Sequence, residues 1–177
     1  FNEELVISQF YNNLSLELNS LASNYQSEII FVLDGCTDNT FKLLTSIVKN
    51  DRRVKIISLS KRYGHQNSII AGLDYAEGDI IIMMDSDMQH PPELISELLS
   101  THESGYEIVH AVRNFPKNNN CIDRFLSRMF YKCINLVSDV NTLEGAADFR
   151  LISKRICDIF KNNIRERDQF LRGLFVW

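Results

Sequence analysis

One stretch of this sequence decides its fold, and it runs Asp79-Ile80-Ile81-Ile82-Met83-Met84-Asp85-Ser86-Asp87-Met88-Gln89-His90-Pro91-Pro92-Glu93. The first half is an apolar run, which is typical of a buried strand, and the run ends directly on two aspartates. The two prolines that follow favour the start of a helix, because proline fits the first turn of a helix. The stretch therefore predicts a strand at 79–84, an acidic loop and then a helix.

The same order of strand, polar loop and helix occurs elsewhere in the chain. Apolar runs predict further strands at 28–33, 54–59 and 106–112. Amphipathic patterns predict helices at 5–21, at 41–48, and from the polar loop at 64–66 to residue 76. Strands that are apolar throughout and separated by helices imply a mainly parallel sheet with helices on both faces. We therefore expect an α/β fold, with no domain boundary within residues 1–177.

The composition is that of one ordinary globular domain. Of the 177 residues, 45% are hydrophobic and 24% are charged, and the net charge is −4. These values exclude the pattern of disordered proteins and the basic surface of nucleic-acid-binding proteins. The longest apolar run, at 80–84, is far shorter than the roughly 20 residues that span a bilayer.

The four cysteines form no C-x-x-C pair and no dense disulfide pattern, and they are Cys36, Cys121, Cys133 and Cys157. This spacing is typical of free thiols in a reducing compartment. We therefore expect a cytosol-facing protein.

Acidic side chains follow two of the predicted strands, at Asp34 and at Asp85 and Asp87. In an open parallel sheet, ligands bind beyond the carboxyl ends of the strands, so both loops are expected to face one cleft. Asp85, Asp87 and Gln89 alternate along an extended segment, and their oxygens form a ligand set suited to Mg²⁺ or Mn²⁺. The other interpretation is an ordinary solvated turn.

Several familiar sites are excluded by their motifs. The chain contains neither G-x-G-x-x-G nor the P-loop pattern, and no G-x-S-x-G elbow. An EF-hand starting at Asp85 fails, because His90 stands where glycine is needed and Ser96 where glutamate is needed. The histidines lack metal-binding spacing, so we expect surface or capping roles for His65, His90, His102 and His110.

Seven segments, in order along the chain, resemble motifs of the inverting family 2 glycosyltransferases of GT-A fold, and among these the polyprenyl-phosphate sugar transferases. Residues 1–4 are similar to the end of P-x-[YF]-N-E-E, residues 32–40 to V-D-D-G-S-T-D-x-T, and residues 60–66 to S-R-N-F-G-H-Q. Residues 84–93 resemble M-D-A-D-L-Q-D-P-P-E most specifically. Residues 111–113 and 145–151 resemble G-x-R and G-A-G-D-F-R-L, and residues 124–131 resemble a basic helix. The resemblance covers essentially the whole chain and implies a Rossmann-like GT-A fold.

Two departures from the family pattern matter for the site. Leu33 replaces the first aspartate of the D-D pair, which the family implies is bonded to the nucleotide base. Base recognition is therefore expected to weaken or to depend on Asp34. Cys36 replaces a serine, and we expect a smaller effect because both side chains are compact.

The resemblance implies roles for individual residues. Asn2, Glu3, Asp34 and Asp85 would hold the nucleotide sugar, and Asp85, Asp87 and Gln89 would hold the metal. Asp148, Arg113 and Arg124 would be catalytic. Asp148 either assists as a base or orients an arginine, and both roles stay open. The cations expected at the acceptor phosphate are Arg113, Arg124, Arg128, Arg150 and Arg172; for Arg128 a solvated helix face is the alternative.

These roles imply a metal-dependent transfer of one sugar from a nucleotide diphosphate to a polyprenyl phosphate at the cytoplasmic membrane face. UDP-glucose is the first candidate donor, followed by other UDP-sugars and GDP-mannose, and a homo-oligomer stays open. One alternative is a phosphatase of the haloacid-dehalogenase type, although Gln89 breaks its D-x-D-x-[TV] pattern. The other is an inactive nucleotide-binding remnant.

Both ends of the chain suggest a longer protein. Residues 1–4 match a motif that would follow a first strand, which is absent here. Residues 170–177 end on an apolar stretch. Because a lipid phosphate lies at the bilayer surface, we expect the intact protein to continue past Trp177 into amphipathic or transmembrane helices.

Overall fold

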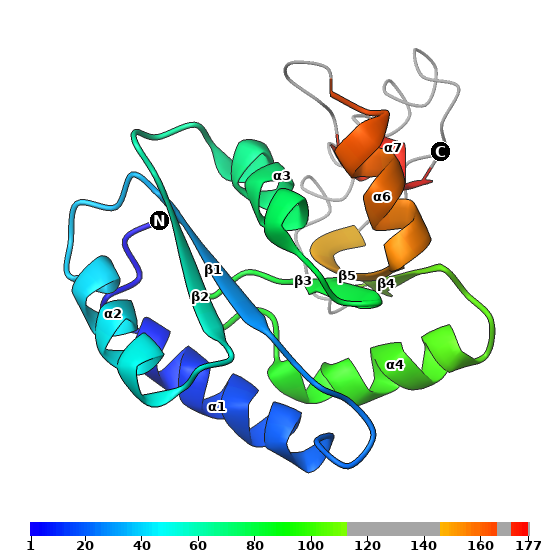
Figure 1. The fold of residues 1–177 in the computed structure, drawn as a ribbon, viewed down its shortest axis with the longest axis horizontal. Coiled ribbons are helices and arrows are strands. Elements are labelled where there is room, and N and C mark those ends of the chain that lie inside the picture. The colour runs from blue at the N-terminus through cyan, green and yellow to red at the C-terminus, as the bar shows by residue number, and fades with distance from the viewer. Residues whose placement is uncertain (113–145, 166–170, 177) are drawn as a thin grey trace, which may run out of the picture.

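The structure of the protein, a computed structural model, describes residues 1–112, 146–165 and 171–176 (Figure 1). The strands are β1 (Ile29–Asp34), β2 (Val54–Leu59), β3 (Ile80–Met83), β4 (Ile108–Val112) and β5 (Ala146–Ser153). The helices are α1 (Ile7–Ser20), α2 (Thr40–Asn50), α3 (His65–Tyr75), the short 3-10 helix η1 (Pro92–Leu94), α4 (Ile95–Glu103), α6 (Lys154–Asn162) and α7 (Leu171–Val176).

Within the described residues, the strands form one parallel and one antiparallel sheet. β1 and β2 pair in parallel, from Ile29 opposite Val54 to Asp34 opposite Leu59. β5 lies between β3 and β4 and runs antiparallel to both. The α/β fold class is therefore confirmed, and β5, which the hydrophobic pattern did not predict, adds an antiparallel centre to the second sheet.

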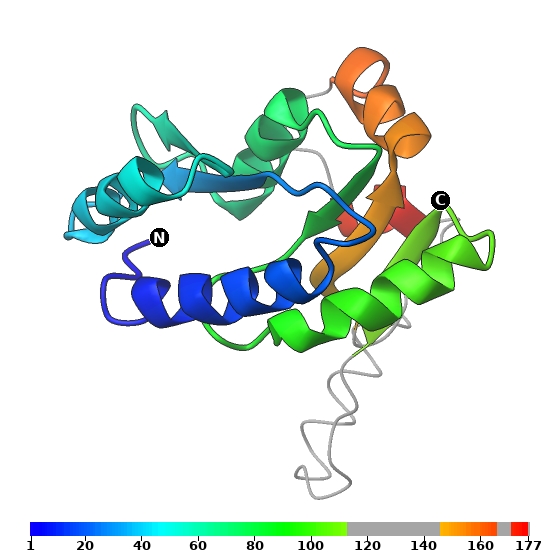
Figure 2. The same cartoon turned by 60° about the horizontal axis from the view of Figure 1, so that its bottom comes forward.

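Helices cover both faces of the sheets, as expected. Figure 2 shows α1 and α4 on one side of the strands and α3 and α6 on the other. Alternate residues of β5 supply the two cores: Phe149 and Leu151 pack with α1 and α4, while Ile152 packs with α3, α6 and α7. Since strand side chains alternate between faces, one central strand joins both cores.

Most predicted elements lie within two residues of their observed bounds. The first helix differs from the prediction in where its buried face begins. Its core face consists of Ile7, Phe10 and Leu14, whereas Leu5 lies before the helix and is 92% exposed. The predicted start of this helix at residue 5 is therefore two residues early, and Leu5 does not belong to its buried face.

Two further expectations concern membrane-spanning helices and the state of the cysteines. None of the helices in the described ranges combines the length and the apolar character needed to cross a membrane. Cys36 and Cys157 are free thiols, as predicted, and Cys157 is 1% exposed. Burial raises the pKa of the Cys157 thiol, so this side chain behaves as a small apolar group. Cys121 and Cys133 lie outside the described residues.

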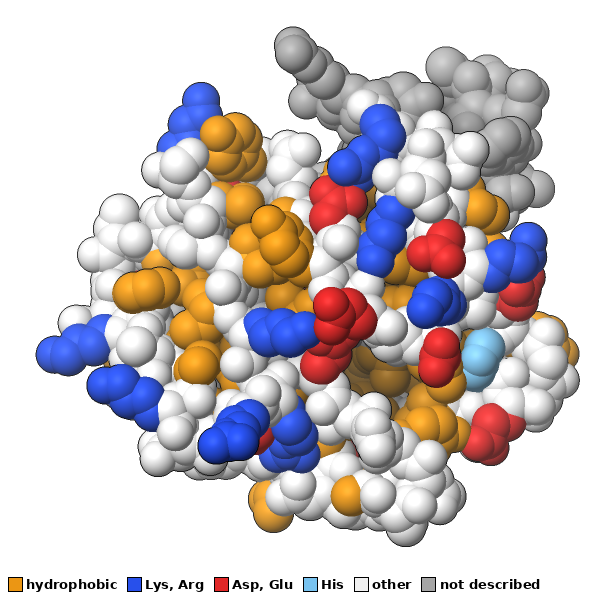
Figure 3. Space-filling view, viewed as in Figure 1, with side chains coloured by type: hydrophobic (Ala, Val, Ile, Leu, Met, Phe, Trp, Pro, Cys, Tyr) orange, Lys and Arg blue, Asp and Glu red, His pale blue; other side chains and the backbone are white. Residues whose placement is uncertain are grey.

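Acidic and basic side chains lie close together on the face shown in Figure 3. Exposed ion pairs join Arg165 to Asp74 at 2.7 Å and Lys55 to Glu28 at 2.8 Å. Such pairs contribute little to stability, because water and salt screen them.

A partly buried network joins α1 to the turn between α2 and β2. The Arg53 guanidinium donates to both carboxylate oxygens of Asp51, at 3.0 Å and 2.7 Å. It also donates to Asn19 and Ser15 of α1, each at 3.0 Å, and the Tyr11 hydroxyl donates to Asp51 at 2.9 Å. The bonds from Arg53 hold the pKa of Asp51 well below its usual range.

We expect Asp51→Asn to lower the free energy of unfolding by about 2 kcal/mol at pH 7, because it weakens charge-assisted bonds in a partly buried place. A carboxyl with a depressed pKa stabilises the fold above its unfolded value of about 4, and this contribution is lost as pH falls below that value. Urea unfolding should therefore show the difference between variant and wild type shrinking from pH 7 to about pH 3. Arg52→Ala, on the exposed neighbour, is the control. A pH-independent difference would contradict this account.

Candidate functional site

The acidic loop after β3 is held in a tight turn by hydrogen bonds between its own backbone amides and side chains. The amide of Gln89 donates to Asp87 Oδ1 at 2.9 Å, and Met88 adopts a left-handed conformation with φ of 68°. The amide of Asp85 donates to His90 Nδ1 at 2.8 Å. The backbone that carries the two aspartates, Asp85 and Asp87, therefore has a defined conformation.

His90 joins this loop to β5. Its side chain is buried, and the ring stacks on Phe149 with centroids 5.3 Å apart and 23° between the planes. Because Nδ1 accepts the bond from Asp85, the ring proton lies on Nε2 in the neutral imidazole. The expectation of a surface position is therefore wrong for His90.

Asp148 lies on β5 and uses both carboxylate oxygens. Arg150 Nη2 donates to Asp148 Oδ1 at 2.7 Å, and these side chains are 2% and 8% exposed. The guanidinium also lies over the Phe175 ring, 4.5 Å from its centroid. Asp148 Oδ2 lies 3.2 Å from His65 Nε2.

His65, the first residue of α3, connects Asp148 with the acidic loop. Its Nδ1 atom lies 3.7 Å from Asp85 Oδ1, while its Nε2 atom contacts Asp148. Four side chains from three segments thus form one cluster: Asp85, His65, Asp148 and Arg150. The spacing between histidines gave no signal for His65 or His90. The available signal for His65 was its match to the histidine of S-R-N-F-G-H-Q, whereas His90 stands where M-D-A-D-L-Q-D-P-P-E has aspartate.

Asp34 supports the loop that leads into α3. Its side chain is buried, and its two oxygens accept from the backbone amides of Tyr63 at 2.6 Å and Gly64 at 2.8 Å. The bonds fix residues 60–64 against the end of β1. Asp34 therefore holds in place the backbone that leads into α3.

Asn2 and Glu3 lie beside the loop at 35–40. The Asn2 amide exchanges two hydrogen bonds with Thr37, at 3.0 Å and 2.9 Å. The backbone amide of Glu3 donates to Thr40 Oγ1 at 2.9 Å, and its side chain is 25% exposed. Of the four predicted nucleotide-binding residues, Glu3 and Asp85 present the more exposed carboxylates, at 25% and 37%.

Asp85, Asp87 and Gln89 offer oxygen donors, which fit a hard divalent cation. Among the described residues, no group of three or more His, Cys, Asp or Glu side chains is arranged to hold a metal by itself. The two observations agree for Mg²⁺, which is usually held by one or two carboxylates together with substrate phosphates and water. The donor set therefore fits a cation that arrives with its substrate.

The predicted acceptor arginines are mostly outside the described part of the chain. Arg113, Arg124 and Arg128 lie in the range 113–145, and of Arg172 only the backbone in α7 is described. Arg150 is described, and its guanidinium is buried between Asp148 and Phe175. Its contact with an acceptor phosphate stays a prediction.

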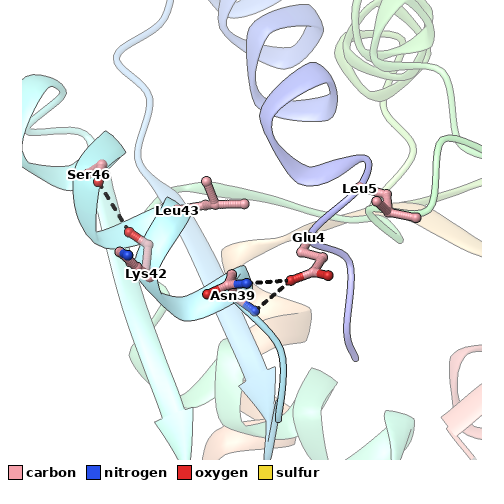
Figure 4. A pocket seen from close by; sticks show the side chains of 6 residues that line it. All are labelled: Glu4, Leu5, Asn39, Lys42, Leu43 and Ser46. Atoms are coloured by element: carbon pink, nitrogen blue, oxygen red, sulfur yellow. Dashed lines mark hydrogen bonds between the residues drawn. The ribbon is translucent and has the colours of Figure 1, made fainter.

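A separate hollow of about 460 Å³ lies between the N-terminal segment and α2 (Figure 4). Glu4 Oε2 closes one side by accepting two bonds from Asn39, each at 2.9 Å. The other lining residues are Leu5, Lys42, Leu43 and Ser46, so none of the predicted site residues contributes.

The sequence of this chain is similar to those of known proteins. The sequence profile of Glycosyl transferase family 2 matches residues 1–160. The chain is 39% identical over its whole length to the uncharacterized glycosyltransferase YkcC of Bacillus subtilis, covering 54% of that protein. It is 34% identical to the prophage bactoprenol glucosyl transferase homolog of Escherichia coli, covering 57% of it. The chain thus spans about half the length of these relatives.

A solved structure described as a mycobacterial protein has a similar fold. It matches with a TM-score of 0.54 and 18% sequence identity, over 83% of this chain and 50% of that one. At this identity the likeness supports the fold alone.

Gly35 allows the loop after β1 to pack on the loop before α3, and this contact can be tested. A Cβ at position 35 would lie 2.8 Å from the backbone nitrogen of Arg62 and the carbonyl carbon of Lys61, and φ is +62°. We expect Gly35→Ala to lower the free energy of unfolding, because the Lys61–Arg62 backbone must move.

The control is Gly105→Ala, where φ is +106° and nothing lies within 4 Å of the added Cβ. This variant carries backbone strain without the clash. In urea unfolding, Gly35→Ala should cost at least about 1 kcal/mol more than the control. Equal costs would mean that the close approach is not needed for stability.

Proposed function

Because the chain belongs to glycosyl transferase family 2, we propose that it transfers one sugar from a nucleotide diphosphate to a polyprenyl phosphate at the cytoplasmic membrane face. The observation that carries the proposal is the cluster in which His65 brings Asp148 next to Asp85 of the acidic loop. The bactoprenol glucosyl transferase names of relatives at 33–34% identity support a polyprenyl phosphate acceptor and favour glucose as the sugar.

On the donor side, Asp85 and Asp87, with Gln89, would hold a divalent cation, Mg²⁺ or Mn²⁺. When bound, the cation offsets the negative charge that develops on the leaving diphosphate. Members of the family generally use divalent metal ions. Asn2 and Glu3 would line the nucleoside pocket, and Asp34 would hold the neighbouring loop in place. Because Leu33 has no polar group, we expect weaker selection among nucleotide bases.

On the acceptor side, Asp148 acts in this proposal as an orienting group. Its ion pair with Arg150 and its bond to His65 occupy both carboxylate oxygens. A phosphomonoester has a second pKa of about 6, so its oxygen is mostly ionised at pH 7 and needs little help from a base. The acceptor instead needs cations, and Arg113, Arg124, Arg128 and Arg172 are the proposed source.

The identifying experiment is a screen of nucleotide sugars with a polyprenyl phosphate extract, using the intact protein. Release of nucleoside diphosphate that depends on the lipid phosphate supports the transferase. Release of free phosphate from simple phosphomonoesters would instead support a phosphatase. Calorimetry with UDP and Mn²⁺ that shows no heat would support an inactive remnant.

The metal assignment predicts the behaviour of Asp87→Asn. The change removes one negative charge at nearly constant volume, so nucleotide-sugar binding should weaken about tenfold or more and lose its dependence on Mn²⁺. Asp79→Asn is the matched control, since Asp79 lies just before β3, at the end of the strand opposite the acidic loop, and is 95% exposed. Titration calorimetry with and without Mn²⁺ measures both effects. Wild-type turnover and Mn²⁺ response in Asp87→Asn would overturn the assignment.

The acceptor assignment predicts the kinetics of Arg124→Ala in the intact protein. Loss of one charge-assisted bond to phosphate should raise the KM for the lipid phosphate about tenfold, while UDP affinity changes less. The comparison is with Arg52→Ala, an exposed arginine in the turn between α2 and β2. If Arg124→Ala kept wild-type kinetics toward the lipid phosphate, this account of acceptor binding would have to be abandoned.

A further inference from the structure

We infer that His65 is a positioning residue, which holds the Asp148 carboxylate of the acceptor side opposite Asp85 of the donor side. The inference rests on the proposed function and adds a residue to its site. Its starting point is the pairing of β3 with β5.

The sheet register brings two carboxylates to the same level. β3 and β5 pair antiparallel, and the last pair joins Met83 to Arg150. Continued past the end of β3, this register brings Asp85 to the level of Asp148. Both residues then lie on the face that carries Ile81 and Ile152, which is the face covered by α3. Like charges at opposite positions repel, so this arrangement needs a group between them.

His65 supplies that group from the first turn of α3. Its Nε2 and Nδ1 atoms lie 3.2 Å from Asp148 Oδ2 and 3.7 Å from Asp85 Oδ1. A carboxylate only accepts, so the short contact has the Nε2–H of His65 as donor. The imidazole thus fixes the oxygen of Asp148 that the Arg150 guanidinium does not bind.

The backbone beneath His65 is itself fixed. Gly64 precedes the helix with φ of +93°, and the amides of Tyr63 and Gly64 donate to the buried carboxylate of Asp34. The helix that carries His65 therefore starts at a defined place. Because the side chain is 49% exposed, its substitution leaves the cores intact.

The test compares three substitutions in the intact protein: His65→Ala, His65→Gln and His65→Asn. A glutamine amide nitrogen reaches about as far from the backbone as imidazole Nε2, whereas an asparagine nitrogen reaches only about as far as Nδ1. Nucleoside diphosphate release is measured with UDP-glucose, or the best donor of the screen, and a polyprenyl phosphate. We expect kcat to fall about tenfold in His65→Ala and His65→Asn, with donor KM changed less than about twofold. His65→Gln should restore at least about half of kcat.

A double-mutant cycle separates positioning from general damage. In an Asp148→Asn background, His65→Ala should lower kcat by less than about twofold further, because the contact is already weakened. His102→Ala is the control, since His102 bonds the carbonyl of Tyr106 away from the site. The thermal midpoints of the His65 and His102 single variants should stay close to wild type, and His65→Ala should not lower the midpoint of the Asp148→Asn background further.

The outcomes distinguish the inference from the proposed function. Wild-type transfer together with unchanged kcat in His65→Ala, or a His65→Gln variant as slow as His65→Ala, overturns the inference alone. A wild-type protein that releases no nucleoside diphosphate with any donor overturns the proposed function and the inference with it. Additive losses in the double mutant also count against positioning.

Discussion

The pairing of β5 with both of its neighbours is the constraint on which the rest of this structure depends. Its antiparallel register sets Arg150 opposite Met83 on one side and His110 on the other. The alternation of its side chains then sends Phe149 into one core and Ile152 into the other. This strand also supplies two of the partners of the acidic loop after β3, because the contacts of the loop through His90 and His65 both end on β5.

Burial decides what the polar groups on this strand can do. The Asp148–Arg150 ion pair is almost closed to water, and a buried charge is tolerated only when it is paired. Each side chain of the pair is therefore held by the other and by the groups around it. These contacts favour a role for Asp148 in holding neighbouring groups in position. They also favour cations more exposed than Arg150 for binding the proposed acceptor phosphate.

Much of this arrangement could be predicted from the sequence, and the rest could not for identifiable reasons. The apolar runs located β1, β2, β3 and β4, because buried strands have a local signature. The direction and pairing of β5 could not be predicted from periodicity, which does not specify a partner. Asp34 was expected to face the cleft because it follows a strand, and the family resemblance alone implied its role toward the nucleotide. Its bonds to two backbone amides depend on a loop distant in sequence. The contacts of His65 with Asp148 and of His90 with Phe149 also join segments distant in sequence, so the spacing between histidines did not indicate them.

The way Asp34 holds the loop has a consequence for sequence variation. Its carboxylate binds the peptide amides of Tyr63 and Gly64 and no side chain of that loop. Every residue except proline presents such an amide. The side chains at 61–63, which are exposed, are therefore free to differ among homologous enzymes while the backbone path stays the same. One buried carboxylate thus fixes the backbone path of the loop independently of its side chains, so their size, charge and polarity can change without a new fold.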